Sequence, residues 1–275
     1  MKPWSYAGSW ALVTGASAGL GEVFARRLAE REMNLVLTAR RAERLAALAA
    51  ELSAGHGVEI LTIPADLARR GEADRVWREA TTGRGIDLLV NNAGFGAQGD
   101  FAEVDLQRHL DLVEVNCTAP MVLAHLAIAH MRPRGGGGII NVSSIAAFQP
   151  VPTLATYAAA KAFVLSLSEA LWAENRRWGI RVLALCPGRT PTEFQEVAGT
   201  GSAEGAFGFR TPEQVVDVGL AAFERDRNYV VPGVENFLAT YLTRALPRSA
   251  VTRGMRRVAK RFLSRRDDAR DDARP

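Results

Sequence analysis

A tyrosine and a lysine four residues apart, Tyr157 and Lys161, are the side chains in this sequence best suited to proton transfer. In a helix this spacing puts the phenol and the ammonium on one face, one turn apart. A fixed positive charge beside a phenol favours the phenolate, so a group that titrates near pH ~10 would exchange protons closer to neutrality. The pair therefore predicts a general acid/base. Exposed Tyr-x-x-x-Lys pairs also arise by chance, so the prediction requires a cofactor loop and substrate-binding groups elsewhere.

A glycine-rich segment near the N-terminus provides the expected cofactor loop. It reads Thr14-Gly15-Ala16-Ser17-Ala18-Gly19-Leu20-Gly21, after the apolar run 10–13 and before the helical pattern 22–30. Glycines let the backbone approach a pyrophosphate closely, with the N–H groups of the helix start behind them. The segment lacks the Gly-Lys-Ser/Thr of a nucleoside-triphosphate loop. A plain tight turn is the alternative, but the strand and helix on either side favour a dinucleotide site.

The next two strands end in residues that fit the adenosine half of a dinucleotide. The apolar run 34–38 leads to Ala39-Arg40-Arg41, where an acidic residue would bind the ribose and an arginine would bind a 2′-phosphate. Arg40 therefore favours NADP over NAD, with a solvated arginine at a helix start as the alternative. The run 58–63 leads to Asp66, which either caps a helix predicted over 68–80 or binds the adenine amino group.

Amides at two further positions suit the nicotinamide side of such a site. Asn91-Asn92-Ala93-Gly94 follows the apolar run 86–90, where amides can tie neighbouring turns together and small residues leave room for a flat ligand. Asn116 lies among apolar neighbours in a helix predicted over 103–130. Asparagine is a poor choice inside a helix unless it has a partner. It is either a satisfied core amide or a kink that places a carbonyl to hold water beside Lys161.

Strands and helices alternate from residue 10 to 186, which predicts an α/β fold. Further strands are expected over 139–142, ending at Ser143-Ser144, and over 180–185, ending before Pro187-Gly188, with the Tyr157 helix over 155–178 between them. Alternation of this kind gives right-handed βαβ units in a Rossmann-type, doubly wound parallel sheet. A helix over 212–224 and a strand over 228–231 close the domain. Every residue singled out above lies at the carboxyl end of a strand or close to one, where such sheets bind ligands.

Composition narrows the class of protein further. The 275 residues are 48% hydrophobic, with no apolar signal segment at the start and no run of the ~18 apolar residues that a membrane span needs. We therefore expect a cytoplasmic protein. Cys117 and Cys186 are expected to be buried structural thiols, and the four histidines show no ligand spacing, so no metal is predicted.

The C-terminal segment is basic and has a helical pattern. Residues 244–266 contain nine Lys/Arg and no acid, and residues 267–275 contain four Asp and two Arg, so residues 1–243 carry a net charge of −3 although the chain carries +4. After a helix predicted over 237–246, residues 249–263 form a basic amphipathic pattern with Val251, Met255, Val258 and Phe262 on one side. It either packs on its own domain or contacts an anionic membrane, another subunit or nucleic acid. Among these partners the membrane surface is favoured, and nucleic acid is the weaker choice.

Taken together, these motifs resemble the short-chain dehydrogenase/reductase family over about residues 8–232. The resemblance rests on the glycine segment, Asp66, Asn91-Asn-Ala-Gly94, Asn116, Ser144, Tyr157-x-x-x-Lys161 and Pro187-Gly188-x-Thr190-x-Thr192. It implies that Asn116, Ser144, Tyr157 and Lys161 are catalytic. The cofactor contacts that it implies, some of them derived above, are Gly15, Ser17, Gly19, Leu20, Gly21, Arg40, Asp66, Leu67, Asn92, Ala93, Gly94, Tyr157, Lys161, Pro187, Gly188, Thr190 and Thr192.

The resemblance also assigns roles. Tyr157 would protonate the substrate carbonyl as hydride arrives from the nicotinamide, or remove the hydroxyl proton in reverse. Ser144 would bind the same oxygen, Lys161 would bind the nicotinamide ribose, and Asn116 would maintain a water chain from Lys161 to solvent. Ser143 would support the strand end. Pairing of the helices 103–130 and 155–178 across an interface would give a homodimer or homotetramer.

The predicted organisation is one catalytic domain over 1–235, a helical extension over 236–266 and a disordered tail over 267–275. The Gly- and Ala-rich segment 194–210 is expected to be a mobile lid over a pocket that is also walled by the uncharged residues 145–154. The predicted function is NADP(H)-dependent interconversion of a ketone or aldehyde and an alcohol, on an apolar or moderately polar small molecule. The alternative is an NADP-binding redox sensor or membrane-associated scaffold without turnover.

Overall fold

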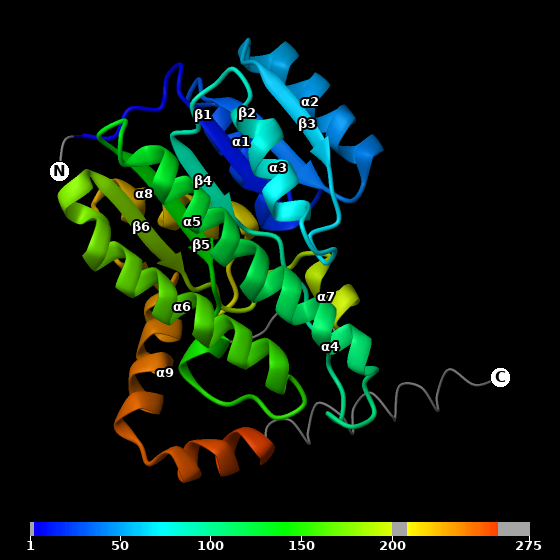
Figure 1. Ribbon diagram of the computed structural model, residues 1–275. Helices are drawn as coiled ribbons and strands as arrows, with labels where there is room; N and C mark the ends of the chain where they lie inside the picture. Colours follow the sequence, from blue (N-terminus) through cyan, green and yellow to red (C-terminus); the bar gives the residue numbers. More distant parts are fainter. Residues whose placement is uncertain (1–2, 200–207, 258–275) are drawn as a thin grey trace.

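A seven-stranded parallel sheet forms the centre of the computed structural model, which describes residues 3–199 and 208–257 (Figure 1). The strand order is β3-β2-β1-β4-β5-β6-β7, and every neighbouring pair is parallel. The chain therefore winds outward in one direction from β1 and then in the other from β4, which confirms the predicted doubly wound fold. The strands are β1 (Trp10–Thr14), β2 (Asn34–Ala39), β3 (Ile60–Pro64), β4 (Leu88–Asn91), β5 (Gly137–Val142), β6 (Ile180–Leu185) and β7 (Tyr229–Val230).

Helices cover both faces of the sheet (Figure 1). One face packs against α1 (Gly19–Ala29), α2 (Ala42–His56) and α8 (Pro212–Glu224), and the other against α3 (Glu72–Thr81), α5 (Ala119–Met131) and α6 (Ala155–Asn175). Successive strand side chains point to opposite faces, so Ala11 and Val13 join the first core while Leu12 joins the second. Because both faces are buried, the strands appear in the sequence as continuous apolar runs.

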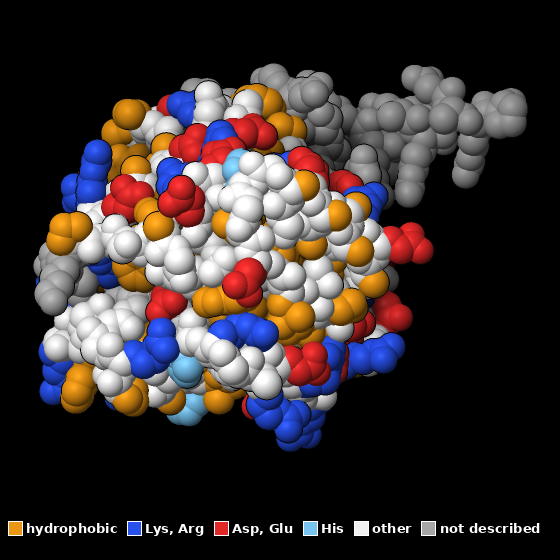
Figure 2. Space-filling model, turned by 90° about the horizontal axis from the view of Figure 1, so that it is seen from above, with side chains coloured by type: hydrophobic (Ala, Val, Ile, Leu, Met, Phe, Trp, Pro, Cys, Tyr) orange, Lys and Arg blue, Asp and Glu red, His pale blue; other side chains and the backbone are white. Residues whose placement is uncertain are grey.

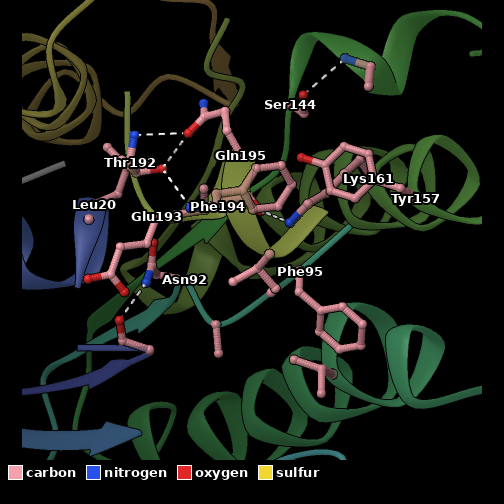
Figure 3. A pocket seen from close by; sticks show the side chains of 18 of the residues that line it. Leu20, Asn92, Phe95, Ser144, Tyr157, Lys161, Thr192, Glu193, Phe194 and Gln195 are labelled. Carbon is pink, nitrogen blue, oxygen red and sulfur yellow. Dashed lines mark hydrogen bonds between the residues drawn. The ribbon is translucent and has the colours of Figure 1, made fainter. Parts of the chain in front are cut away.

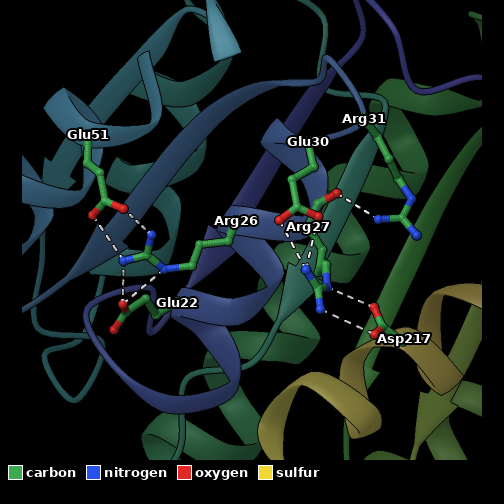
Figure 4. A network of polar contacts seen from close by, with 7 residues as sticks. All are labelled: Glu22, Arg26, Arg27, Glu30, Arg31, Glu51 and Asp217. Carbon is green, nitrogen blue, oxygen red and sulfur yellow. Dashed lines mark hydrogen bonds and ion pairs between the residues drawn. The ribbon is translucent and has the colours of Figure 1, made fainter. Parts of the chain in front are cut away.

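A network of arginines attaches α1 to its neighbours on the first face (Figure 4). Arg26 bonds with Glu22 of its own helix and Glu51 of α2, and Arg27 bonds with Asp217 of α8 at 2.9 Å. These pairs are partly exposed, so each is expected to add no more than about 1 kcal/mol to the free energy of unfolding. The arginines of α1 thus link this helix to α2 and α8.

The long helix predicted over 103–130 is divided in three. It consists of α4 (Leu106–Val113), a π-helical turn over Glu114–Thr118 and α5. Among the described helices, the stretch Leu106–Met131 is long and apolar enough to span a membrane, and half of its most apolar window is buried inside the protein. Burial of this kind is what the core helix of an α/β domain requires, so the stretch is weak support for a membrane span.

Two further helices follow the sheet at the carboxyl ends of the strands (Figure 1). They are α9 (Val234–Ala245) and a helix over 248–257. The predicted domain boundary at residue 235 falls within the first turn of α9. The end of the predicted basic helix, including Val258 and Phe262, lies outside the described residues, as do the tail 267–275 and part of the predicted lid, 200–207.

Candidate active site

A cleft of about 1340 Å³ lies beyond the carboxyl ends of the strands (Figure 3). All the predicted catalytic and cofactor residues line it except Gly21 and Asn116. The segments that supply them are up to 177 residues apart in sequence, from Gly15 after β1 to Thr192 after β6. The parallel sheet brings them together because it places the ends of all its strands at one edge.

The glycine turn has the geometry of an anion cradle. Helix α1 begins at Gly19, and no side chain caps its first N–H groups at Ala18. A Cβ on Gly21 would collide with the carbonyl oxygen of Gly15, so only glycine permits this closure of the turn. Free N–H groups at a helix start favour a phosphate. The residues present therefore fit the pyrophosphate of a nicotinamide dinucleotide.

Asn92 fixes the position of this turn. Its side-chain nitrogen donates to the carbonyl oxygen of Thr14 at 2.9 Å, and the backbone nitrogens of Asn92 and Ala93 both donate to Thr14 Oγ1 at 3.0 Å. The end of β4 is thus tied to the end of β1, as the paired amides predicted. Asn91 has a different use, since it is buried and donates to Asn141 on β5 at 2.9 Å.

Tyr157, Lys161 and Ser144 meet at the centre of the cleft (Figure 3). Lys161 Nζ lies 5.7 Å from the centroid of the Tyr157 ring and donates to the carbonyl oxygen of Val142 at 2.8 Å. Ser143 is buried and donates to the carbonyl oxygen of Lys161 at 2.8 Å, while Ser144 Oγ faces the cleft and accepts from the nitrogen of Ala146 at 3.1 Å. Ser144 is thus placed to contact a ligand, and Ser143 supports the lysine.

The pKa of Tyr157 is shifted opposite to the prediction. Burial raises the pKa of Tyr157 to about 12, and a hydrogen bond with Ser144 opposes this shift. Burial lowers the pKa of Lys161 to about 8. Desolvation is the largest cause of both shifts, because a buried phenolate or ammonium loses its hydration by water.

Asn116 lies behind this group in the π-helical turn. Its side-chain nitrogen donates to the carbonyl oxygen of Phe95 at 2.8 Å, and its oxygen, Oδ1, is buried without a partner among the described residues. A Cβ on Gly94 would collide with that oxygen and lie 3.3 Å from Lys161 Nζ. The absence of a side chain at Gly94 therefore leaves a small polar space between the Asn116 amide and the Lys161 amine. A water molecule in this space would donate the hydrogen bond that Asn116 Oδ1 lacks.

The adenosine end of the cleft contains arginines and one unpredicted glutamate. Arg40 is exposed and lines the cleft. Arg41 donates to Ser17 Oγ at 3.1 Å and pairs with Glu193 at 2.6 Å, and Arg44 pairs with the other oxygen of Glu193 at 2.6 Å. Hydrogen bonds from both arginines hold the pKa of Glu193 below its usual value. No local sequence signal marked Glu193, because its partners lie about 150 residues away.

Asp66 does not cap the helix that was predicted to start at Ala68. It accepts from the backbone nitrogen of Ala68 at 3.2 Å within a turn, whereas α3 starts at Glu72 with Gly71 as its N-cap. The glycine in this turn interrupts the helix that composition favoured. Asp66 and the buried Leu67 both line the cleft, so contact with the cofactor stays a prediction for each.

The segment after Pro187-Gly188 closes the cleft from the other side. Thr192 packs 3.1 Å from where a Cβ of Gly19 would lie, and its nitrogen donates to Gln195 at 2.9 Å. Helix α7 (Phe194–Ala198) follows, and the ring of Phe194 lies 5.3 Å from that of Tyr157. Phe194 and Gln195 were not predicted as site residues. Part of the predicted lid is therefore a short helix that presents an aromatic ring to Tyr157.

The basic segment after α9 packs on its own domain. Val251 is buried, and Met255 lines the cleft. The apolar side chains of this helix that the structure describes are therefore turned inward, as the packing alternative required. Its arginines Arg253, Arg256 and Arg257 are exposed.

The cysteines and histidines do not form a second centre. Cys117 is half-buried and Cys186 buried, both are free thiols, and burial raises the pKa of each. Within residues 3–199 and 208–257, no group of three or more His, Cys, Asp or Glu side chains could hold a metal ion. His109 is buried and forms a hydrogen bond with Thr156 at 2.9 Å, so its ring has a structural role in the core.

The parallel sheet, the anion cradle and the Tyr/Lys pair define a Rossmann-type, nicotinamide-nucleotide class of oxidoreductase. A family model described as short chain dehydrogenase matches residues 9–202. The chain belongs to the short-chain dehydrogenase/reductase family.

The names of three curated relatives refer to different activities. The chain is 32% identical to the very-long-chain 3-oxoacyl-CoA reductase of Anas platyrhynchos, over 94% of this chain and 82% of that protein. It is 36% identical to hydroxysteroid dehydrogenase-like protein 1 of Gallus gallus and 35% identical to the inactive hydroxysteroid dehydrogenase-like protein 1 of Rattus norvegicus. Each of these two matches covers 66% of this chain and 55% of the relative, so the chain spans about half their length.

Three solved structures match 84% to 86% of the chain. A short-chain dehydrogenase from Sphingobium yanoikuyae in complex with NADPH is 34% identical, with a TM-score of 0.79 over 86% of this chain and 94% of that one. A bulky-bulky ketone specific alcohol dehydrogenase from Comamonas testosteroni is 33% identical, with a TM-score of 0.75 over 86% and 92%. A 3-ketoacyl-(acyl-carrier-protein) reductase from Brucella melitensis complexed with NADH is 26% identical, with a TM-score of 0.75 over 84% and 98%. Proteins with this fold thus bind either NADPH or NADH.

Proposed function

We propose that the protein is an NADP(H)-dependent oxidoreductase that interconverts a ketone or aldehyde and an alcohol on an apolar substrate. The observation that carries this proposal is the meeting of Tyr157, Lys161 and Ser144 in the same cleft as the glycine cradle. A protein that only bound a dinucleotide would need the cradle but no positioned proton donor.

The chain's residues divide the reaction between them. A bound reduced nicotinamide supplies the hydride. Ser144 and Tyr157 donate hydrogen bonds to the substrate's carbonyl oxygen, and Tyr157 gives its proton to that oxygen as the carbon receives the hydride, so an alcohol forms. The raised pKa of Tyr157 suits this direction, because the phenol keeps its proton at neutral pH until the oxygen becomes basic.

Lys161 and Asn116 restore the proton that Tyr157 gives up. The ammonium of Lys161 stabilises the phenolate that remains after transfer. The unpartnered Asn116 Oδ1 close to Lys161 would accept a hydrogen bond from a water, through which the proton returns from solvent. In the oxidative direction the same path would carry the proton outward.

We infer NADP(H) as the preferred cofactor from the charges at the adenosine end. Arg40 and Arg41 line the cleft beside Ser17, and the residue at the end of β2 is the neutral Ala39. Two guanidinium groups suit a 2′-phosphate, whereas a free ribose hydroxyl is usually bound by a carboxylate. The NADPH complex of the Sphingobium relative supports this choice, and the NADH complex of the Brucella relative makes it worth testing.

The substrate wall supports an apolar molecule. The ring of Phe194 lies 5.3 Å from that of Tyr157, and the same cleft is also lined by the apolar side chains of Val151, Pro152, Leu154, Val197 and Met255. The names of three relatives refer to very-long-chain oxoacyl groups, hydroxysteroids and bulky ketones. We propose a carbonyl compound with a large apolar group as the substrate.

The competing proposal is a cofactor-binding protein without turnover, acting as a redox sensor or scaffold. A relative named inactive gives it some support. The complete set of Asn116, Ser144, Tyr157 and Lys161 argues against it, since a scaffold gains nothing from a proton relay. The two proposals differ in one measurable property, which is oxidation of NADPH by a carbonyl substrate.

We also propose a homodimer or homotetramer that works in the cytoplasm. Large apolar side chains are exposed on the helices expected to pair, namely Leu106, Leu110, Val113, Met121 and Phe163. Burial against a second copy would remove this surface from water. Sedimentation of the purified chain would determine the oligomeric state.

The test of turnover compares the native protein with Tyr157→Phe. Both are incubated with NADPH and a panel of bulky ketones and acyl ketones, and NADPH oxidation is followed by absorbance. Native protein should turn over at least one substrate, while Tyr157→Phe should bind NADPH and unfold like the native protein but lose turnover by about 100- to 10 000-fold. Unchanged turnover in the variant would refute the assigned acid, and NADPH binding without turnover of any carbonyl would favour the scaffold.

A further inference from the structure

Helix α9 has its polar side chains turned inward and its large apolar side chains turned outward, the reverse of an ordinary surface helix. Asn236 and Thr240 are only 3% and 5% exposed. Six large apolar residues between 234 and 246 are 42% to 72% exposed, namely Val234, Phe237, Leu238, Tyr241, Leu242 and Leu246. Their three- and four-residue spacing forms a continuous stripe. A stripe of this kind marks a contact surface.

The orientation of α9 is fixed by its buried side. Asn236 Nδ2 donates to the carbonyl oxygens of Gly208 and Pro232, at 2.8 and 2.9 Å. A Cβ on Gly188 would lie 2.5 Å from the same nitrogen, so α9 packs directly on the turn that follows β6. The apolar stripe is therefore held outward by specific hydrogen bonds and by close packing.

The charge around the stripe identifies its partner. Residues 236–257 contain five arginines and no Asp or Glu, and Arg248, Arg253, Arg256 and Arg257 are exposed. The face shown in Figure 2 differs, since acidic and basic side chains are interspersed there. Glu235, at the start of the stripe, pairs with Arg210 at 2.7 Å, and the charged residues that follow it up to residue 257 are all arginines. An apolar stripe followed by cations matches the acyl and headgroup layers of an anionic lipid surface. A second copy docked through the same patch by two-fold symmetry would bring cations against cations.

The position of α9 connects this surface to the active site. The helix contacts the turn Ile145–Phe148, whose residues Ile145 and Ala146 line the cleft, and Met255 of the following helix lines it as well. Both helices lie at the carboxyl ends of the strands (Figure 1), where residues that line the cleft also lie. Docking through α9 would place the cleft next to the membrane.

We propose that the exposed stripe of α9, with the arginines that follow it, docks the protein on an anionic lipid bilayer. The stripe would enter the boundary between headgroups and acyl chains, and the arginines would bind lipid phosphates. The lipid contact is thus assigned to α9 instead of the apolar side of the basic helix, which faces its own domain. An apolar substrate would reach the cleft from the bilayer without crossing water.

Vesicle co-sedimentation of the full chain tests this proposal. Native protein should pellet with phosphatidylcholine/phosphatidylglycerol vesicles and much less with phosphatidylcholine alone. The double variant Leu238→Glu/Leu242→Glu should bind the mixed vesicles more weakly by roughly tenfold or more. Arg253→Gln and Arg256→Gln should each weaken binding roughly fivefold and reduce its salt dependence. Val218→Glu, which changes a partly exposed apolar residue of α8, is the matched control and should bind like native protein.

Two further measurements separate lipid docking from turnover and from self-association. Tyr157→Phe should dock like native protein, which separates docking from turnover, so the failure of one would leave the other standing. Light scattering of the Leu238→Glu/Leu242→Glu variant should show an unchanged oligomeric state. Native protein that stays in the supernatant at low salt, a double variant that pellets equally well, or a native oligomer that the double variant dissociates would each overturn the proposal.

Discussion

The two ends of the cleft are built by opposite physical means. At the end proposed to be catalytic, Lys161 and Asn116 are 5% and 1% exposed, and each side chain is held by a hydrogen bond to a backbone carbonyl. At the adenosine end the side chains of Arg41, Arg44 and Glu193 are 42% to 52% exposed and held by one another. Moving a buried polar group breaks its hydrogen bond and costs free energy, whereas exposed ion pairs are weak because water and salt screen them.

This difference assigns a role to each end. The catalytic end gains from rigidity, because proton transfer requires fixed distances and a low local dielectric. Single substitutions at the end proposed to bind adenosine should be tolerated, since the ion pairs of Arg41, Arg44 and Glu193 are exposed. We therefore expect substitutions at the catalytic end to affect rate strongly, and substitutions at the adenosine end to affect cofactor selection more mildly.

The largest effect should come from Ser144, compared with its neighbour Ser143. Ser144→Ala should lower turnover by about 100-fold or more, because it removes a hydrogen bond to the reacting oxygen. It should also lower the free energy of unfolding by up to about 1 kcal/mol, because the nitrogen of Ala146 loses its acceptor, so the loss of turnover is what sets it apart. Ser143→Ala should instead lower the free energy of unfolding by about 1 kcal/mol, because the buried carbonyl of Lys161 loses a donor. Steady-state kinetics and urea unfolding distinguish them, and the reverse pattern would exchange the roles of the two serines.

Cofactor choice should respond next most strongly. Arg40→Asp should shift the ratio of NADP to NAD affinity by roughly tenfold to 100-fold toward NAD, because a charge-assisted contact to the 2′-phosphate becomes a repulsion. Arg78→Asp on α3 makes the same charge change outside the cleft and should leave the ratio unchanged. Equal affinity of the native protein for both cofactors would show that Arg40 does not select the phosphate.

The pH dependence of NADPH affinity reports the protonation of Lys161 and requires no measurement of turnover. Burial lowers the pKa of Lys161 to about 8, so its amine is charged below pH 8 and neutral above. A bound dinucleotide favours the charged amine, so binding takes up a proton above pH 8. Affinity for NADPH should be constant below pH 8 and then fall by up to about tenfold per pH unit. Lys161→Gln should abolish this fall, and the same fall in the variant would assign it elsewhere.

The smallest effect concerns Glu193. Glu193→Gln should raise NADP(H) affinity by up to about fivefold and leave NAD(H) affinity unchanged, because Arg41 and Arg44 become free for the 2′-phosphate. Glu43→Gln on α2 controls for net charge. Calorimetry measures both affinities. A loss of affinity for both cofactors would show that Glu193 holds the segment around Thr192 in place and does not compete with phosphate.

The sequence predicted the positions of the site residues best where they follow strands that are buried on both faces. Strands covered on both faces appear as apolar runs, and the residues after them meet at one edge, so Asn92, Ser144 and Tyr157 could be placed together before any coordinates. A kink at Asn116 was one of the two alternatives that the sequence left open, but its form as a π-helical turn was not predicted, because each flanking helix keeps its own apolar pattern. Asn116 itself was identified by its unfavourable position in a helix.

Other features depend on long-range packing that local patterns do not contain. The Glu193 pairs join segments about 150 residues apart, and periodicity shows that a helix has two faces without showing which one is buried, as in α9. The Tyr157–Lys161 spacing revealed the nearby charge but not the desolvation that dominates both pKa values. The direction of the tyrosine's shift was therefore wrong.

A crystal structure with NADP bound would test the central claim most directly. We predict that the nicotinamide ring lies between Tyr157, Lys161 and Thr192, with the phenol oxygen and Ser144 Oγ open to one substrate atom, and that the 2′-phosphate contacts Arg40 or Arg41. A nicotinamide bound elsewhere, or a Tyr157 phenol turned away from it in a cleft that no carbonyl compound can enter, would contradict the proposed enzyme.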